Sequence, residues 1–196
     1  VQVGNLFKDT SLPINGPLSG RFQVSGNTDN FDTKTLRIQG DASLATAGGR
    51  ITANNIKVKD GVYLARVRAS NVLLQQLSEQ IPKSFKGKLN GDFDVAGSLD
   101  SFAPESIVAT GKGEIKTPGG VITASNIQVK NGIYLGQVGV NNVRFRDLSE
   151  QVQESFTGRL TGKFNLAGSL DSFAPESLIV SGDANLNTAV GKISAR

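Results

Sequence analysis

The residue types that most often perform acid–base, nucleophilic or metal chemistry are scarce in this sequence. It contains no histidine and no cysteine among 196 residues. Without imidazole and thiol groups, most catalytic triads, all thiol nucleophiles and the usual zinc sites are excluded. No glycine-rich phosphate-binding motif is present. We therefore expect a protein that is not an enzyme, with no catalytic residues, no metal and no cofactor.

One carboxylate pair has the spacing of a calcium-binding loop. Asp92, Asp94 and Gly97 occupy positions 1, 3 and 6 of such a loop. The glutamate that would bind calcium at position 12 is missing, because Ala103 stands there. We expect these carboxylates to lie on a solvated surface instead.

Apolar and polar residues alternate along most of the chain. In GKLNGDFDVAG, Leu89, Phe93 and Val95 alternate with charged and amide side chains. This period of two is typical of a strand with one apolar and one polar face. The pattern predicts an all-β fold, an elongated and mainly antiparallel sheet.

The pattern is also repeated. AGSLDSFAPES occurs at Ala96–Ser106 and again at Ala167–Ser177, a shift of 167 − 96 = 71 residues. Such a period indicates an array whose units contact their neighbours. We divide the chain into a partial repeat (1–39), two full repeats (40–110 and 111–181) and the start of a further one (182–196). Together they form one continuous solenoid-like domain, which we expect to be a piece of a longer array.

Two irregular segments interrupt the strands of each repeat. AGSLDSFAPES is expected to connect successive repeats, as a linker rather than as a binding loop. In LLQQLSEQIPKSFKG, Leu74, Leu77 and Ile81 have helical spacing, which predicts a short amphipathic helix. That helix would be either a structural cap on the sheet edge or a lid.

The hairpin sequence RITANNIKVKDGVYLARVRAS predicts a bend. The apolar residues occupy every second position, but this alternation shifts by one residue between Ala53 and Ile56 and again between Leu64 and Val67. With a three-residue Lys59–Asp60–Gly61 loop, the two shifts would lie opposite each other on the paired strands. Irregularities of this kind bend a sheet. The expected pairs are 58/62, 56/64, 53/67 and 51/69, with 129/133, 127/135, 124/138 and 122/140 in the next repeat. We therefore predict a curved sheet that encloses an apolar trough.

Glycines also predict the register between the last strand of one repeat and the first strand of the next. We expect Phe93 opposite Gly111, Gly91 opposite Gly113, and Phe164 opposite Gly182, because aromatic rings often cover facing glycines in sheets.

The apolar face must be covered. It amounts to roughly 1,500 Å² per repeat, whereas soluble monomers expose a few hundred Å². The candidates are a second sheet, the curled sheet itself, or a guest. An aliphatic lining without buried polar groups favours acyl chains as the guest. The expected lining residues are Leu44, Ile51, Ile56, Val58, Val62, Leu64, Val67, Leu89, Phe93, Val95, Ile115, Ile122, Ile127, Val129, Ile133, Leu135, Val138, Leu160, Phe164 and Leu166.

The charges indicate no nucleic-acid partner. The net charge is +4, from 21 basic and 17 acidic residues that are interspersed along the chain. No cluster of lysine and arginine has the pattern of a nucleic-acid footprint. No apolar run is long enough to span a membrane.

Two motifs carry a family resemblance. GKLNGDFDVAGSL and GRLTGKFNLAGSL, together with GGRITANNIKVKDGVYL and GGVITASNIQVKNGIYL, resemble the repeats of the TamB family of translocation and assembly module proteins, and its cyanobacterial members in particular. The resemblance covers essentially the whole chain. It implies a β-taco fold, a long curved sheet with an apolar interior, as in AsmA-like, bridge-like lipid transfer proteins. It also implies a periplasmic protein anchored in the inner membrane, with an outer-membrane barrel partner of the insertase class.

Three functional hypotheses remain open at this stage. The first is a conduit for phospholipid between the inner and outer membranes, which supports outer-membrane biogenesis. The second is a scaffold or chaperone for outer-membrane protein assembly or secretion, which binds client strands at the sheet edges by β-augmentation. The same edges predict edge-to-edge self-association. The third is a closed β-solenoid adhesin with a dry core.

Overall fold

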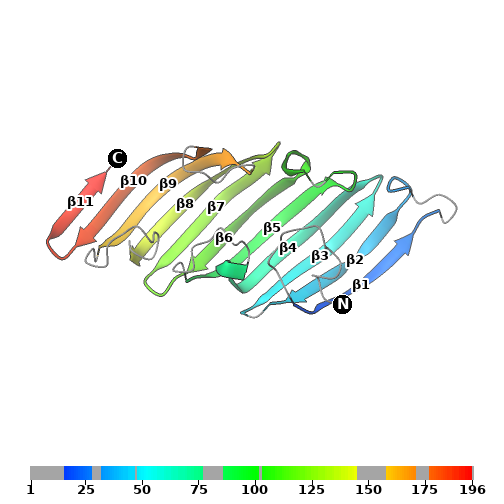
Figure 1. Ribbon diagram of the computed structural model, residues 1–196, viewed down its shortest axis with the longest axis horizontal. Helices are drawn as coiled ribbons and strands as arrows, with labels where there is room; N and C mark the ends of the chain where they lie inside the picture. Colours follow the sequence, from blue (N-terminus) through cyan, green and yellow to red (C-terminus); the bar gives the residue numbers. More distant parts are fainter. Residues whose placement is uncertain are drawn as a thin grey trace.

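The described part of the chain is a single β-sheet. A computed structural model describes residues 16–27, 32–46, 48–76, 86–101, 103–144, 158–170 and 177–195. Eleven strands form one open antiparallel sheet in which the spatial order is the sequence order. Figure 1 shows the strands side by side along the long axis, from β1 at one end to β11 at the other. The predicted all-β, elongated antiparallel fold is confirmed.

The strand bounds are as follows: β1 (Leu18–Ser25), β2 (Arg37–Ala45), β3 (Arg50–Lys59), β4 (Val62–Leu73), β5 (Lys88–Ser98), β6 (Val108–Lys116), β7 (Val121–Lys130), β8 (Ile133–Arg144), β9 (Arg159–Ser169), β10 (Ile179–Thr188) and β11 (Gly191–Ala195).

Strands β2 to β5 recur as β6 to β9. The start of β2 at Arg37 corresponds to the start of β6 at Val108, a shift of 108 − 37 = 71. The end of β5 at Ser98 corresponds to the end of β9 at Ser169, a shift of 169 − 98 = 71. The boundaries expected after residues 39, 110 and 181 fall inside β2, β6 and β10. Hydrogen-bonded pairing therefore continues through each of them.

The β3–β4 hairpin turns on two residues rather than the three that we expected. Asp60 and Gly61 both have positive φ, 53° and 75°. Positive φ at both central positions defines the type I′ turn, whose twist matches that of the flanking strands. Val58 therefore faces Tyr63 instead of Val62. The second hairpin has the same turn at 131–132, where φ is 53° and 72°.

The turn decides which of the expected pairs form. Beyond the bulge, 53/67 and 51/69 are paired as predicted, and so are 124/138 and 122/140 in the next repeat. Close to the turn, 58/62, 56/64, 129/133 and 127/135 are wrong by one residue. The predicted parity slip in β4 between Leu64 and Val67 is absent, because the pairing runs without a break from Ala65 to Ala69.

The irregularities that do occur are β-bulges built on asparagine. Asn55, Asn71, Asn126 and Asn142 have φ between 53° and 57°, and each lies at a shift of register. Asparagine tolerates this left-handed conformation better than most residues. The bulges of β3 and β4 lie at different heights, not at one height as predicted. Bulges increase twist and bend strands, and the strands are bowed in Figure 1.

The two long sides of the sheet have different connections. The β3–β4 and β7–β8 turns and the repeat-to-repeat connections lie on one side, which we call the junction rim. On it, the β5–β6 connection contains a short 3₁₀ turn, η3 (Pro104–Ser106). The other side, the opposite rim, carries the β2–β3 and β6–β7 turns. There η2 (Leu74–Gln76) is a 3₁₀ turn, and the rest of the predicted amphipathic helix, with Leu77 and Ile81, lies outside the described residues.

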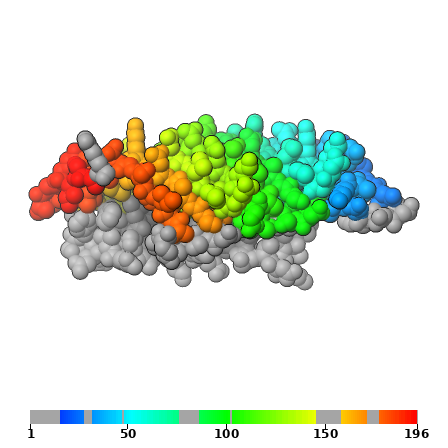
Figure 2. Space-filling model, turned by 90° about the horizontal axis from the view of Figure 1, so that it is seen from above, coloured from blue at the N-terminus to red at the C-terminus, as the bar shows by residue number. Residues whose placement is uncertain are grey.

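Few described side chains are buried. The buried apolar residues are Val58, Ala69, Val72, Leu74, Val140 and Val143. Figure 2 shows the described strands in sequence order along the molecule. The sheet formed by these strands is open, with β1 and β11 as its edges, so it does not match the closed solenoid of the third hypothesis.

Candidate functional site: the apolar face of the sheet

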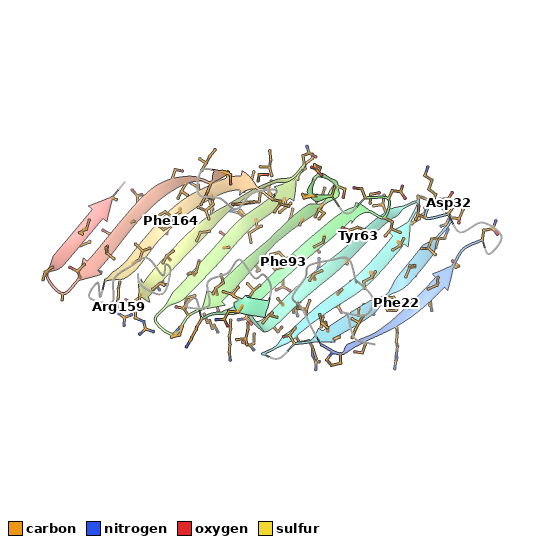
Figure 3. The ribbon with its side chains drawn as sticks, viewed as in Figure 1. Phe22, Asp32, Tyr63, Phe93, Arg159 and Phe164 are labelled. Atoms are coloured by element: carbon orange, nitrogen blue, oxygen red, sulfur yellow. The ribbon has the colours of Figure 1, made fainter. Side chains whose placement is uncertain are left out.

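We define the apolar face as the side of the sheet that carries Phe22 of β1, Phe93 of β5 and Phe164 of β9 (Figure 3). Directly paired residues share a face, and neighbours along a strand alternate. The other side is called the polar face. The ladder places these predicted lining residues on the apolar face: Leu44, Ile51, Ile56, Val58, Val67, Leu89, Phe93, Val95, Ile115, Ile122, Ile127, Val129, Val138, Leu160, Phe164 and Leu166.

The remaining predicted lining residues lie on the polar face: Val62, Leu64, Ile133 and Leu135. Leu64 pairs with Lys57, and Leu135 pairs with Gln128. The two-residue turn causes the error, because shortening the loop by one residue inverts the facing of the residues beside it. All of them are well exposed, between 44% and 55%.

The phenylalanines cover glycines, as predicted. Phe93 is paired with Gly111, and Phe164 with Gly182, while Gly91 faces Gly113. A Cβ atom placed at Gly111 would lie 2.5 Å from Cδ1 of Phe93, and one at Gly91 would lie 2.7 Å from Cε2 of the same ring. The ring therefore occupies the space above both glycines.

A second aromatic–glycine contact escaped the sequence analysis. Tyr63 is paired with Gly97, and a Cβ atom at that glycine would lie 2.5 Å from the tyrosine oxygen. Tyr134 and Gly168 repeat the arrangement at the same distance. The signal was present, because both residues recur after 71 positions. The three-residue turn that we assumed had placed the tyrosine on the polar face.

The most buried residues of this face were also missed. Val72 and Val143 have no exposed surface, and both follow a bulge asparagine. The bulge reverses the alternation, so a simple count from Val67 would assign Val72 to the polar face. The Asn–Val dipeptide at the same position of both repeats was the available signal.

Side chains of the neighbouring strand bond to the bulges. Asp41 accepts a hydrogen bond from the backbone N–H of Asn55 at 2.9 Å. Asn90 accepts one from Asn71 at 2.9 Å, and Thr161 accepts one from the equivalent Asn142 at 3.2 Å. These bonds pair backbone donors that the ladder leaves open.

The polar face carries ion pairs between paired residues. Arg66 Nε lies 2.9 Å from Asp94 Oδ1, and Arg68 Nε lies 2.6 Å from Asp92 Oδ1. The hydrogen bond that Arg66 donates to Asp94, and then the negative charge of that carboxylate, raise the pKa of Arg66 above its ordinary value. These carboxylates are thus bonded to arginines. No group of three or more acidic side chains that could hold a metal occurs among the described residues.

A small apolar patch interrupts the polar face in each full repeat. In the first it consists of Leu64, Ala96 and Val108, which are neighbours across three strands. In the second it consists of Leu135, Ala167 and Ile179. The partial first repeat has Ser25 and Arg37 at the matching positions, so the patch is not common to all copies.

The apolar face offers contact without hydrogen bonding, because its strands present aliphatic and aromatic groups. No described segment forms a helix with the length and apolar character needed to cross a bilayer. No protein-family model, curated protein or solved structure matches this chain.

Proposed function

We propose that the apolar face binds the acyl chains of phospholipid, and that the array carries phospholipid between the inner and outer membranes in support of outer-membrane biogenesis. The observation that carries the proposal is the continuity of the face. The residues of each strand on this side pair with apolar residues or glycines of the next, from β1 to β11. Acyl chains need no hydrogen bonds, so such a surface suits them.

The geometry of the repeat supports the same proposal. Strands spaced by ~4.8 Å advance the face by about 19 Å for each repeat of four strands. A guest held by one repeat therefore meets an equivalent apolar surface in the next, without a polar gap between them. In this proposal the curved sheet forms a trough, with the acyl chains inside and the head groups at a rim.

The cellular setting rests on the resemblance of the repeats to the TamB family. From it we propose a periplasmic location, an inner-membrane anchor in the full-length protein and an outer-membrane barrel partner of the insertase class.

The decisive experiment is mass spectrometry of organic extracts from the purified chain. Val67→Asp combined with Val138→Asp places a carboxylate at the same point of the apolar face in two repeats. Leu64→Asp combined with Leu135→Asp is the matched control, because these residues lie three positions earlier on the same strands and on the polar face. We expect phospholipid in near-stoichiometric amounts from the wild type and the control, and its loss from the first variant.

Two outcomes would overturn the proposal. One is a folded wild-type chain that yields no lipid, and the other is equal lipid from both double variants. Circular dichroism verifies the fold of each variant. If the aspartates unfold the sheet, Val67→Thr combined with Val138→Thr keeps the side-chain shape and still reduces the apolar character, so it should lower the recovered lipid.

A second candidate function is a scaffold for outer-membrane protein assembly or secretion. It is favoured by the open edges, since β1 and β11 each have one hydrogen-bonded neighbour. Such edges bind extended client strands by β-augmentation. A proline in β11, such as Ser194→Pro, should abolish binding of a client peptide, whereas Val67→Asp with Val138→Asp should leave it unchanged. The reverse result would exclude this candidate in favour of the conduit.

A further inference from the structure

The opposite rim gathers positive charge around one turn. The turn is 117–120, between β6 and β7. Lys86, Lys88 and Lys116 line a single surface depression together with Thr117 and Pro118. Two arginines of the same repeat, Arg144 and Arg159, reach the turn from the other side.

Arg159 donates hydrogen bonds from Nη1 to the carbonyl oxygens of Gly119, at 2.9 Å, and of Asn142, at 3.1 Å. Arg144 lies against the same glycine, since a Cβ atom placed at Gly119 would be 2.9 Å from its Nε. Figure 3 shows Arg159 at the end of the strands away from Tyr63. The arginines thus hold the turn at Gly119, directly after Thr117 and Pro118 of the depression.

Lys88 and Lys116 are directly paired across β5 and β6. Like charges at such positions destabilise a sheet. The described partner of this group is Glu114, whose Oε1 lies 3.4 Å from the Nζ of Lys116. One carboxylate does not balance three ammonium groups, so an anion in the depression would relieve the repulsion. Lysine binds phosphate as a point charge, through short charge-assisted hydrogen bonds.

Apolar surface adjoins these charges. Leu73 lines the depression beside the lysines. Gly87, which lines it too, is packed closely between Leu74 and Ile115, because a Cβ atom there would lie 2.9 Å and 2.8 Å from their side chains. Ile115 belongs to the apolar face. Lys88 and Lys116 lie on the polar face, since their neighbours Leu89 and Ile115 are on the apolar face. The depression therefore lies at the rim, where only the backbone around Gly87 separates its lysines from the apolar face. An amphipathic anion bound there would reach the apolar face by passing its acyl chains over this rim.

The junction rim lacks this asymmetry. There Lys59 Nζ lies 3.7 Å from the carboxylate of Asp60, and Asp100 accepts a hydrogen bond from Thr33 at 2.7 Å. Carboxylates therefore accompany the cation in the described part of that rim, which offers no comparable attraction for an anion.

We propose that the depression lined by Lys86, Lys88 and Lys116 binds the phosphate of an anionic phospholipid head group, so that the array prefers anionic lipid. This inference rests on the proposed function, because the acyl chains of the same lipid would lie on the apolar face.

The test uses the whole 196-residue chain and vesicles that contain equal amounts of phosphatidylglycerol and phosphatidylcholine. After incubation, the protein is re-isolated by gel filtration and the ratio of the two lipids in its extract is measured. We expect about fivefold or greater enrichment of phosphatidylglycerol, from the attraction of each lysine to an anionic lipid. In Lys88→Gln combined with Lys116→Gln, the ratio should return to that of the vesicles while total lipid is unchanged.

The matched control is Lys57→Gln combined with Lys130→Gln, which removes the same charge near the junction rim. Equal loss of enrichment in both double variants would show that the enrichment depends only on the net charge of the chain, and would overturn the inference. So would lipid bound without enrichment. Absence of any lipid on the wild type would instead mean that the proposed function fails.

A titration with inorganic phosphate tests whether the site binds free phosphate or the phosphate of a lipid head group. The phosphate is titrated against the chain without vesicles, and binding is followed by calorimetry. We expect weak binding, because free phosphate makes no apolar contact. Tight, lysine-dependent binding of phosphate, with no preference for phosphatidylglycerol, would assign the site to free phosphate and contradict the lipid proposal.

Discussion

At the residue scale, the shape of the apolar face depends on glycines that lie beneath aromatic rings. Phe93 covers Gly91 on its own strand and Gly111 on the next, and Tyr63 covers Gly97. A side chain at these positions would lift the ring from the sheet. The aromatic groups thus lie against the backbone, and the surface above them stays smooth enough for an aliphatic guest.

This packing predicts different costs for two alanine substitutions in the same strand. In Gly111→Ala, the new Cβ would lie 2.5 Å from both Phe93 and the carbonyl oxygen of Asp92. We expect a loss of about 1–3 kcal/mol in the free energy of unfolding. In Gly113→Ala the nearest atom is 3.4 Å away, so the change should be neutral or stabilising by about 0.5–1 kcal/mol. Urea denaturation measures the stability of both variants. Equal unfolding midpoints would contradict the packing of Phe93 against Gly111.

At the element scale, the bulges decide which side chains of β3, β4, β7 and β8 reach the apolar face. Each bulge inserts one residue, and the alternation inverts beyond it. Val72 and Val143 are buried for this reason. The local cause is a left-handed backbone conformation at a single asparagine.

Substitutions at Asn142 test that cause. Its φ is 57°, which glycine adopts freely and valine does not. Asn142→Gly should leave the unfolding midpoint nearly unchanged, whereas Asn142→Val should lower stability by about 1–2 kcal/mol. If valine is tolerated as well as glycine, the bulge does not depend on the left-handed conformation.

At the scale of the whole molecule, the sheet formed by the described strands ends in two exposed edges. Val24 of β1 is 64% exposed and Ile193 of β11 is 57% exposed, and both lie on the apolar face. A second copy that adds a strand at either edge would continue this face.

We expect the chain to associate through these edges in a concentration-dependent manner, as sedimentation velocity will show. Val24→Lys with Ile193→Lys should keep it monomeric, because an inward-pointing charge blocks pairing at an edge strand. Ser25→Lys with Ser194→Lys adds the same charge on the polar face and should preserve association. Monomers at all concentrations of the wild type would rule out self-association.

The sequence by itself determined the strands, their order and the repeat, because these depend on local properties. Alternation with a period of two follows from the backbone geometry of a strand, and the 71-residue shift is visible in the letters. The pairing of Phe93 with Gly111 was also predicted correctly, since the aromatic–glycine pattern fixed the register of strands β5 and β6.

Only the tertiary structure decided the facing of residues beside the hairpin turns. Lys59–Asp60–Gly61 allowed a two-residue or a three-residue loop, and the twist of the paired strands selected the shorter one. That choice moved Leu64 to the polar face and brought Tyr63 over Gly97. The cluster of Lys86, Lys88 and Lys116 was equally invisible in the sequence, because pairing across β5 and β6 is what brings residues about thirty positions apart to one turn.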